Sequence, residues 1–134
     1  MAGSYVLDGL AVPGSLERLH ALVEQVAAEN PDVDPVDLSM FETAVVELAG
    51  NVVEHGRPVG KVLFHLCLDV RAESLRGLLS DSGEALPEVP AAEVPDVLAE
   101  SGRGLALARG CLDELSYRRV DDRNTWTLLR VRHA

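Results

Sequence analysis

The chain has 134 residues, enough for one folded domain, and its 47% apolar and 25% charged residues are ordinary for a globular protein. The formal net charge is −10 and the sequence has no basic stripe, so a direct nucleic-acid partner is not expected, because phosphate backbones require clustered positive charge. No segment approaches the ~18 uninterrupted apolar residues of a membrane span, and the N-terminus lacks the basic region of a signal peptide. We expect a cytoplasmic protein with one domain over residues 1–134.

The first part of the chain predicts one strand followed by two helices. Residues 4–12 are short and rich in strand-forming types, and a proline-glycine pair ends them. Ser15 is a suitable N-cap for a first amphipathic helix, which Asn30-Pro31 ends. Asp34-Pro35 opens a second helix of about 20 residues, and Gly56 is its expected C-terminal stop.

The rest of the chain predicts two strand pairs separated by a long loop and a helix. The expected elements are strands 60–70 and 75–80, a loop at 81–104, a helix at 105–115, and strands 116–120 and 125–131. Strands joined by short turns pair antiparallel, and the helices do not follow every strand. This order predicts an α+β fold with helices on one face of a sheet, and not a doubly wound parallel fold.

The second helix carries a polar pair at the rim of its apolar stripe. At about 100° per residue, Glu47 and Asn51 lie on one side, next to the core positions Phe41, Val45, Leu48 and Val52. A ligand along this rim could meet both polar groups; a solvated glutamate and a polar neighbour are the alternative. His55 follows one turn later and could face the same ligand or cap the helix beside Gly56.

Two further stretches suit a nucleotide. Asp81-Ser82-Gly83 follows a strand end, where the acid can accept an amine hydrogen bond and the glycine lets a flat ring approach. An ordinary turn is the alternative. Gly102, Arg103 and Gly104 precede the helix expected from Leu105, and amides at a helix start attract anions. A flexible helix entry with a solvated arginine is the alternative there.

In combination and order, these stretches resemble the motifs of the Bergerat-fold (GHKL) ATPases. The family motifs are Glu-x-x-x-Asn (Glu47, Asn51), Asp-x-Gly (Asp81, Gly83) and Gly-x-Gly-Leu (Gly102, Gly104, Leu105), and the match spans nearly the whole chain. Thr125 in the last strand resembles a family threonine. The short chain and its GRGLALARGCLDEL segment look most like the anti-sigma-factor serine/threonine kinase branch.

The resemblance implies a two-layer α/β sandwich with a mixed, mostly antiparallel sheet, and ATP or ADP with Mg²⁺ as cofactors. Asn51 would supply an oxygen to Mg²⁺ and Glu47 would activate a serine hydroxyl. Asp81 and Gly83 would hold adenine, with Thr125 assisting or serving only as a strand residue. Residues 84–101 would form a lid, and residues 102–105 would hold the phosphates.

The same resemblance implies a sigma factor and a small anti-anti-sigma-type protein as partners, and a homodimer is possible. Two departures favour a nucleotide-binding module without catalysis: Ala85 replaces a second glycine of many relatives, and Glu100 stands where some carry a basic residue. A detached sensor histidine-kinase domain is a second alternative, although the chain shows no histidine-bearing dimerisation helix.

Overall fold

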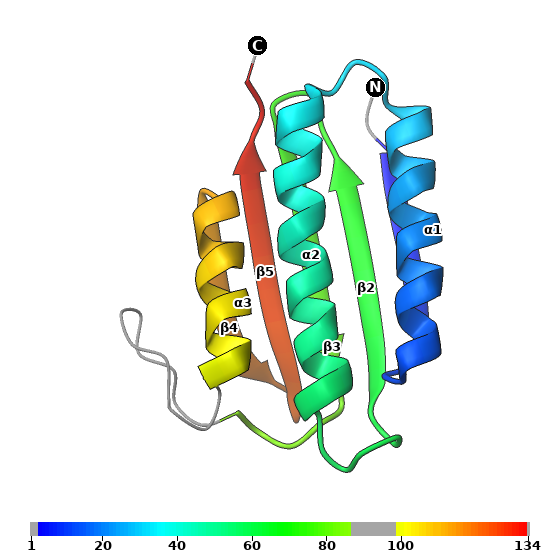
Figure 1. The fold of residues 1–134 in the computed structure, drawn as a ribbon, viewed down its shortest axis with the longest axis vertical. Helices are drawn as coiled ribbons and strands as arrows, with labels where there is room; N and C mark the ends of the chain where they lie inside the picture. Colours follow the sequence, from blue (N-terminus) through cyan, green and yellow to red (C-terminus); the bar gives the residue numbers. More distant parts are fainter. Residues whose placement is uncertain (1–2, 87–98, 134) are drawn as a thin grey trace.

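The computed structural model describes the backbone of residues 3–86 and 99–133. Five strands form one sheet in the order β1-β2-β3-β5-β4 (Figure 1). The strands are β1 (Gly3–Leu10), β2 (Leu63–Val70), β3 (Ser74–Asp81), β4 (Glu114–Val120) and β5 (Arg123–Val131). All four pairings between the described strands are antiparallel, so the sheet has none of the parallel pairs that a mixed sheet would contain.

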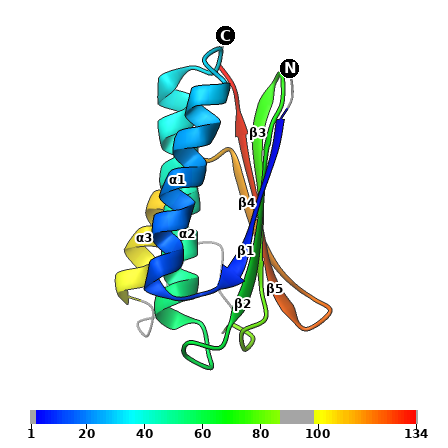
Figure 2. The same cartoon turned by 90° about the vertical axis from the view of Figure 1, so that its right-hand side faces the viewer.

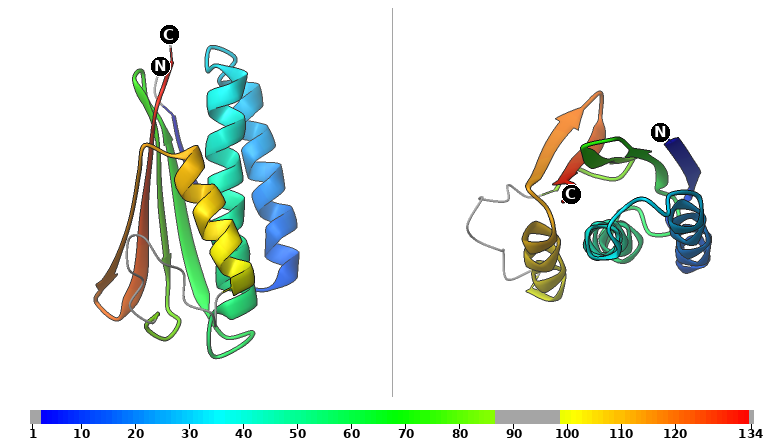
Figure 3. Two further views of the ribbon diagram at one scale, coloured as in Figure 1. Left: turned by 60° about the vertical axis from the view of Figure 1, so that its left-hand side comes forward. Right: turned by 90° about the horizontal axis from the view of Figure 1, so that it is seen from above.

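Three described helices cover one face of this sheet, as the edge-on view shows (Figure 2). They are α1 (Pro13–Glu29), α2 (Pro35–His55) and α3 (Ala99–Cys111). Seen from above, α2 lies between α1 and α3 (Figure 3). The predicted α+β fold with helices on one face is confirmed.

The core lies between the two layers because the strands alternate buried and exposed side chains. Val62, just before β2, and residues 64, 66, 68 and 70 within it are buried on the helix-facing side, as their spacing predicted. They meet the apolar stripe of α2 and the inner positions of α1. The largest fully buried apolar side chains of the core are Leu19, Val45, Leu48, Val62, Leu66, Leu75, Leu79 and Leu128.

Local signals set the ends of α2 but not the start of α1. The Asp34 carboxylate accepts a hydrogen bond from the Val36 amide at 2.7 Å, and the Gly56 amide bonds the Val52 carbonyl at 2.9 Å. The predicted cap at Ser15 is wrong, because α1 already begins at Pro13, whose fixed φ suits a first helical position. Ser15 is buried inside the first turn and donates to the Leu10 carbonyl at 2.6 Å.

The third helix differs most from the prediction. It runs over Ala99–Cys111 instead of 105–115, so it begins six residues earlier and ends four residues earlier. The chain leaves the helix after Cys111 because the Asp113 amide bonds the Leu129 carbonyl at 2.9 Å, which starts the pairing of β4 with β5. The turn between those strands is tight, with positive φ at Asp121 and Asp122 only.

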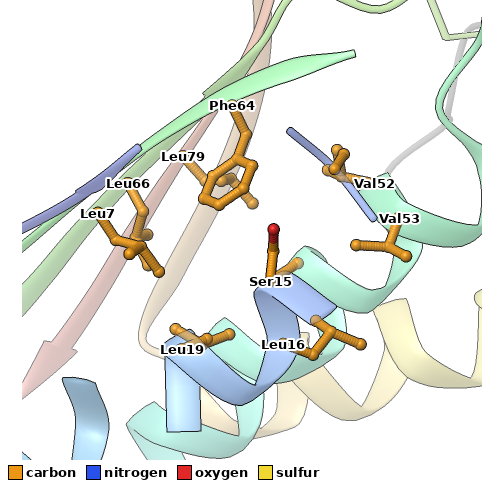
Figure 4. A pocket seen from close by; sticks show the side chains of 11 residues that line it. Leu7, Ser15, Leu16, Leu19, Val52, Val53, Phe64, Leu66 and Leu79 are labelled. Carbon is orange, nitrogen blue, oxygen red and sulfur yellow. The ribbon is translucent and has the colours of Figure 1, made fainter. Parts of the chain in front are cut away.

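A small cavity lies in the core between α1, α2 and the sheet (Figure 4). Its volume is about 10 Å³, which is at the lower limit for a single water molecule. Apolar side chains provide almost all of its lining, including Leu7, Leu16, Leu19, Val52, Val53 and Phe64. This cavity is therefore a packing defect of the core and not a ligand site.

Candidate functional site

The C-terminal half of α2 presents its polar groups on the side that faces α3. Glu47, Asn51 and His55 are each half-buried there, at the rim of the core as the helical spacing predicted. A Cβ atom at Gly104 would lie only 2.4 Å from Oε2 of Glu47. The glycine therefore allows α3 to pass directly over the Glu47 carboxylate, and the two motifs are brought into contact.

His55 ends α2 with an unsatisfied ring nitrogen. Its Nε2 atom is buried and has no hydrogen-bond partner among the described residues; the Glu54 carboxylate is 3.8 Å away. A buried polar atom of this kind calls for a further partner, such as water or a ligand oxygen. The Gly56 amide meanwhile bonds the Val52 carbonyl, so the backbone already ends the helix without the histidine ring.

Asp81 lies at the end of β3 and is 3% exposed. Its Oδ1 atom accepts hydrogen bonds from the Gly83 amide at 2.9 Å and from Nδ2 of Asn124 at 3.0 Å. Any Cβ at position 83 would come within 2.8 Å of this oxygen, so the turn requires glycine. The hydrogen bonds that described residues make to Asp81 all use Oδ1, which leaves Oδ2 available to an amine donor.

Asn124 is the main site residue that the sequence did not reveal. It is 2% exposed, and its amide nitrogen also donates to the Glu84 carbonyl at 2.9 Å. Its Oδ1 accepts from the Tyr117 hydroxyl at 2.5 Å and from Nη1 of Arg119 at 3.1 Å. Asparagine is depleted in strands, so its presence in the last strand could have marked it as unusual. Its contact with Asp81 could not be predicted, because it depends on the strand register that places Asp81 opposite Asn124.

Thr125, the predicted assistant of Asp81, lies on the other face of β5. Successive side chains of a strand point to opposite faces, so burial of Asn124 beneath the helices turns Thr125 outward. The Thr125 hydroxyl makes only a long contact of 3.5 Å to the Arg123 carbonyl. The strand residue that contacts Asp81 is therefore Asn124, and the position of Thr125 fits the alternative in which it serves only as a strand residue.

The backbone after Asp81 is held by the β4–β5 pair. Nη1 of Arg119 donates to the Gly83 carbonyl at 2.7 Å, and the Leu86 amide donates to the Tyr117 hydroxyl at 3.4 Å. These contacts fix the start of the expected lid at 84–101. Ala85, where many relatives have glycine, is exposed within it. Residues 87–98 of the expected lid lie outside the described residues.

The Asp81 turn and the end of α2 are neighbours. The Glu84 amide donates to the Arg57 carbonyl at 2.9 Å, just beyond the helix. Val62 lies between the two segments, since Cβ atoms at Gly56 and at Gly83 would each meet its side chain at about 3.5 Å. Both segments and the start of α3 therefore share the lower end of the molecule in Figure 1.

The glycine-rich stretch does not precede a helix as predicted. Gly102, Arg103, Gly104 and Leu105 all lie inside α3, and Leu105 is a buried core residue. In a helix that begins at Ala99, only the amides of the first turn lack helical partners. The amides of Gly104 and Leu105 are thus used within the helix, and Gly104 serves close packing on Glu47. The side chains of Glu100 and Arg103 are outside the described part of the structure.

Protein side chains alone do not form a metal site here. Among the described residues, no cluster of three or more His, Cys, Asp or Glu side chains could hold a metal ion. Mg²⁺ commonly keeps several waters and binds through one or two protein oxygens together with substrate phosphates. A single side-chain oxygen from Asn51 would suit that mode.

These features were compared with known proteins. The model of the histidine kinase-like ATPase domain matches residues 10–131. The chain belongs to this family. Its membership in the GHKL superfamily confirms the resemblance found in the motifs and implies that the domain binds ATP or ADP. No curated protein matches the chain.

The solved structures with a similar fold include the following two. One contains the RsbU and RsbW domains of Rv1364c from Mycobacterium tuberculosis, with 18% identity and a TM-score of 0.66 over 98% of this chain. The other is the histidine kinase domain of the blue-light activated kinase of Erythrobacter litoralis EL346, with 15% identity and a TM-score of 0.57 over 86% of this chain. The matches cover 33% and 59% of those chains, so this GHKL domain spans only part of each.

None of the helices that the structure describes is both long and apolar enough to cross a lipid bilayer.

Proposed function

We propose that this GHKL domain binds Mg-ATP at the lower end of α2 and transfers phosphate to a serine of a small partner protein. One observation carries the proposal: the helix bearing Glu47 and Asn51 ends directly beside the Asp81–Gly83 turn, through the hydrogen bond from Glu84 to Arg57. The residues proposed for adenine and those proposed for the phosphates are thus adjacent.

The Asp81 half suits adenine. Oδ2 of Asp81 is available to an exocyclic amine, and Gly83 removes the Cβ that would otherwise crowd the carboxylate. Asn124 holds the carboxylate in one orientation, so it does not have to be ordered when the ligand arrives. In this proposal, the adenine half of the site needs little rearrangement on binding.

The α2 half suits the phosphates and the reacting hydroxyl. The side-chain oxygen of Asn51 would bind Mg²⁺, and the Nε2 atom of His55 has an unused hydrogen-bonding capacity for a phosphate oxygen or water. Bound Mg²⁺ would neutralise charge on the phosphates during transfer. Glu47 would accept the proton of the attacking serine hydroxyl.

The start of α3 supplies the remaining part of the phosphate site in this proposal. As the helix stands, the free amides belong to its first turn, and Gly104 lies against Glu47. Unwinding of that turn would free the amides of residues 102–105 and uncover the Glu47 carboxylate. The glycines at 102 and 104 lower the cost of this change, since glycine weakens a helix by about 1 kcal/mol relative to alanine.

The proposed partners are a sigma factor and a small anti-anti-sigma-type protein. The motifs resemble the anti-sigma-factor kinase branch, and one solved structure of similar fold contains an RsbW domain. A catalytically inactive nucleotide-binding module is the second candidate. The contact of Gly104 with Glu47 supports it, because a covered carboxylate cannot reach a substrate hydroxyl. The similarity to a histidine kinase domain leaves a detached sensor-kinase domain as a third.

Thermal unfolding with and without Mg-ATP tests the binding step. At a concentration 100-fold above Kd, ATP should raise the melting temperature by about 8 °C. Asn51→Ala should lose most of this shift, whereas Glu24→Ala, at an exposed acid of α1, should keep it. A wild-type protein that is folded but shows no shift would end the nucleotide proposal.

Transfer of labelled γ-phosphate separates the kinase from the module. Glu47→Ala should keep the thermal shift and lose transfer to a serine of a candidate small acceptor protein. Transfer to a histidine would instead favour the sensor-kinase alternative. Persistent ATP binding without transfer to any acceptor would favour the module.

A further inference from the structure

The hydrogen bonds that the described residues make to the Asp81 side chain use one of its two carboxylate oxygens. Oδ1 accepts from the Gly83 amide at 2.9 Å and from Nδ2 of Asn124 at 3.0 Å. An ionised carboxylate has about two acceptor sites on each oxygen, so these two donors saturate Oδ1. A ligand at Asp81 therefore meets a carboxylate with one free acceptor atom, Oδ2.

The neighbouring groups determine which end of the Asn124 amide faces Asp81. Arg119 can only donate hydrogen bonds, and its Nη1 atom lies 3.1 Å from Oδ1 of Asn124. The Tyr117 hydroxyl accepts from the Leu86 amide at 3.4 Å and donates to the same Asn124 oxygen at 2.5 Å. Because two donors hold the amide oxygen, the amide nitrogen must point to Asp81.

Both protons of the Asn124 amide nitrogen have acceptors. One is donated to Asp81 and the other to the Glu84 carbonyl, at 2.9 Å. Asn124 is 2% exposed, so a rotation that broke these bonds would leave buried polar groups without partners. Asn124 is therefore held in place when a ligand arrives, and Oδ1 of Asp81 stays occupied.

A single free carboxylate oxygen suits adenine better than guanine. Adenine presents one exocyclic amine, and one N–H of this amine is sufficient to bond Oδ2 of Asp81. Guanine presents two parallel donors, the N1–H and the N2 amine, which need both oxygens of a carboxylate to be satisfied together. Its O6 atom replaces the adenine amine with an acceptor, which a carboxylate repels. A site that leaves buried polar groups of the wrong base unpaired discriminates strongly against that base.

We propose that Asn124 is a specificity-determining residue, which selects adenine over guanine nucleotides because it occupies Oδ1 of Asp81. This inference rests on the proposed function, in which Asp81 binds the adenine of ATP. Binding of the adenine amine needs only the carboxylate at position 81. Selection against guanine also needs the amide of Asn124, which β5 places beside β3 (Figure 1).

Competition of ATP, GTP and ITP against a fluorescent ADP measures this selectivity. Wild type should bind ATP at least about 100-fold more tightly than GTP. Asn124→Ala releases Oδ1 for the second guanine donor, so its affinity for GTP should rise and the ATP preference should fall at least about tenfold. The variant should also bind GTP more tightly than ITP, whose base lacks the N2 amine. A purely structural role of Asn124 would instead weaken the binding of all three nucleotides.

Two control variants should keep the wild-type preference for ATP. Thr125→Ala changes the adjacent residue, whose side chain points to the other face of β5. Tyr117→Phe removes one donor to the Asn124 oxygen, but Arg119 still holds the amide in its orientation. Wild type itself supplies a test that needs no variant: GTP should have no advantage over ITP, because the second donor finds no free oxygen.

The outcomes separate this inference from the proposed function. Tighter binding of GTP than of ITP by wild type, or an unchanged GTP affinity in folded Asn124→Ala, would overturn the role of Asn124 and leave ATP binding intact. A folded wild type that binds none of the three nucleotides would overturn the proposed function, and this inference with it.

Discussion

Asn124 illustrates how one buried amide can organise a candidate binding site. It connects Asp81, the Glu84 carbonyl, the Tyr117 hydroxyl and Arg119 with hydrogen bonds of 2.5 to 3.1 Å. Every one of these groups belongs to the Asp81 turn or to the β4–β5 pair. A buried polar network of this kind is stabilising only while each member keeps its partner.

Removal of the Asn124 amide should therefore affect both stability and nucleotide affinity. We expect Asn124→Ala to lower the free energy of unfolding by about 1–3 kcal/mol, since it removes one hydrogen-bond partner from the buried Asp81 carboxylate and one from the Tyr117 hydroxyl. It should also reduce the ATP-induced thermal shift. Urea unfolding and thermal unfolding with Mg-ATP measure the two effects.

Thr125→Ala is the matched control at the neighbouring, outward position. It should change the free energy of unfolding by no more than about 0.5 kcal/mol and keep the thermal shift. If Thr125→Ala instead lowered the free energy of unfolding and the thermal shift more than Asn124→Ala does, Thr125 would be the residue that supports Asp81.

At the scale of elements, the contact between α2 and α3 connects packing with chemistry. Gly104 allows α3 to lie on the Glu47 carboxylate, so the approach of the two helices and the position of a candidate catalytic group depend on one missing side chain. The added methyl of an alanine would meet the flexible end of Glu47, which can move aside. Substitution should thus displace the carboxylate without disrupting the helix.

We expect Gly104→Ala to retain or increase stability, by up to about 1 kcal/mol, while it impairs phosphoryl transfer. Gly110→Ala is the matched control, because a Cβ at that position of α3 meets nothing within 4 Å. The control should gain stability and keep transfer. Equal transfer by both variants would show that the Glu47–Gly104 contact has no bearing on the reaction.

At the scale of the whole molecule, a buried ion pair closes the end opposite the site. Asp37, in the first turn of α2, accepts hydrogen bonds from Arg130 at 2.9 Å and from the backbone amide and ring of His133 at 2.7 Å. Arg130 also donates to the Cys111 carbonyl at 2.8 Å. The start of α2, the end of α3 and the end of β5 are thereby joined.

This cluster should make stability depend on pH in the acid range. Burial by itself raises the pKa of Asp37, but the hydrogen bonds from His133 and Arg130 outweigh it and hold the pKa below its ordinary value. The ionised group therefore stabilises the fold above the unfolded pKa of about 3.9, and this contribution is lost as pH falls below that value through the folded pKa.

Asp37→Asn should lower the free energy of unfolding at pH 7 by about 3 kcal/mol, because Arg130 is left buried without its charge partner. Its stability should also decline less than that of wild type below about pH 4. Urea unfolding between pH 3 and 7 measures both effects, with Glu24→Gln as a control that should follow wild type. Parallel pH profiles for wild type and Asp37→Asn would contradict this role of the cluster.

The sequence alone determined the features that depend on near neighbours in the chain. The caps at Asp34 and Gly56 and the period of 3.6 residues were sufficient to define α2 and to place Glu47, Asn51 and His55 on one side of it. Alternation predicted the buried face of β2 and the hairpin with β3. The motif order led to the family for the same reason, since each motif spans only a few residues.

The tertiary structure decided which distant segments meet. Asp81 and Asn124 are 43 residues apart, and only the pairing of β3 with β5 brings them together. The glycines before Leu105 suggested a helix entry, yet packing on Glu47 makes them part of α3. Local propensity acts over a turn or a few residues, whereas strand pairing and helix packing follow from burial of the whole core.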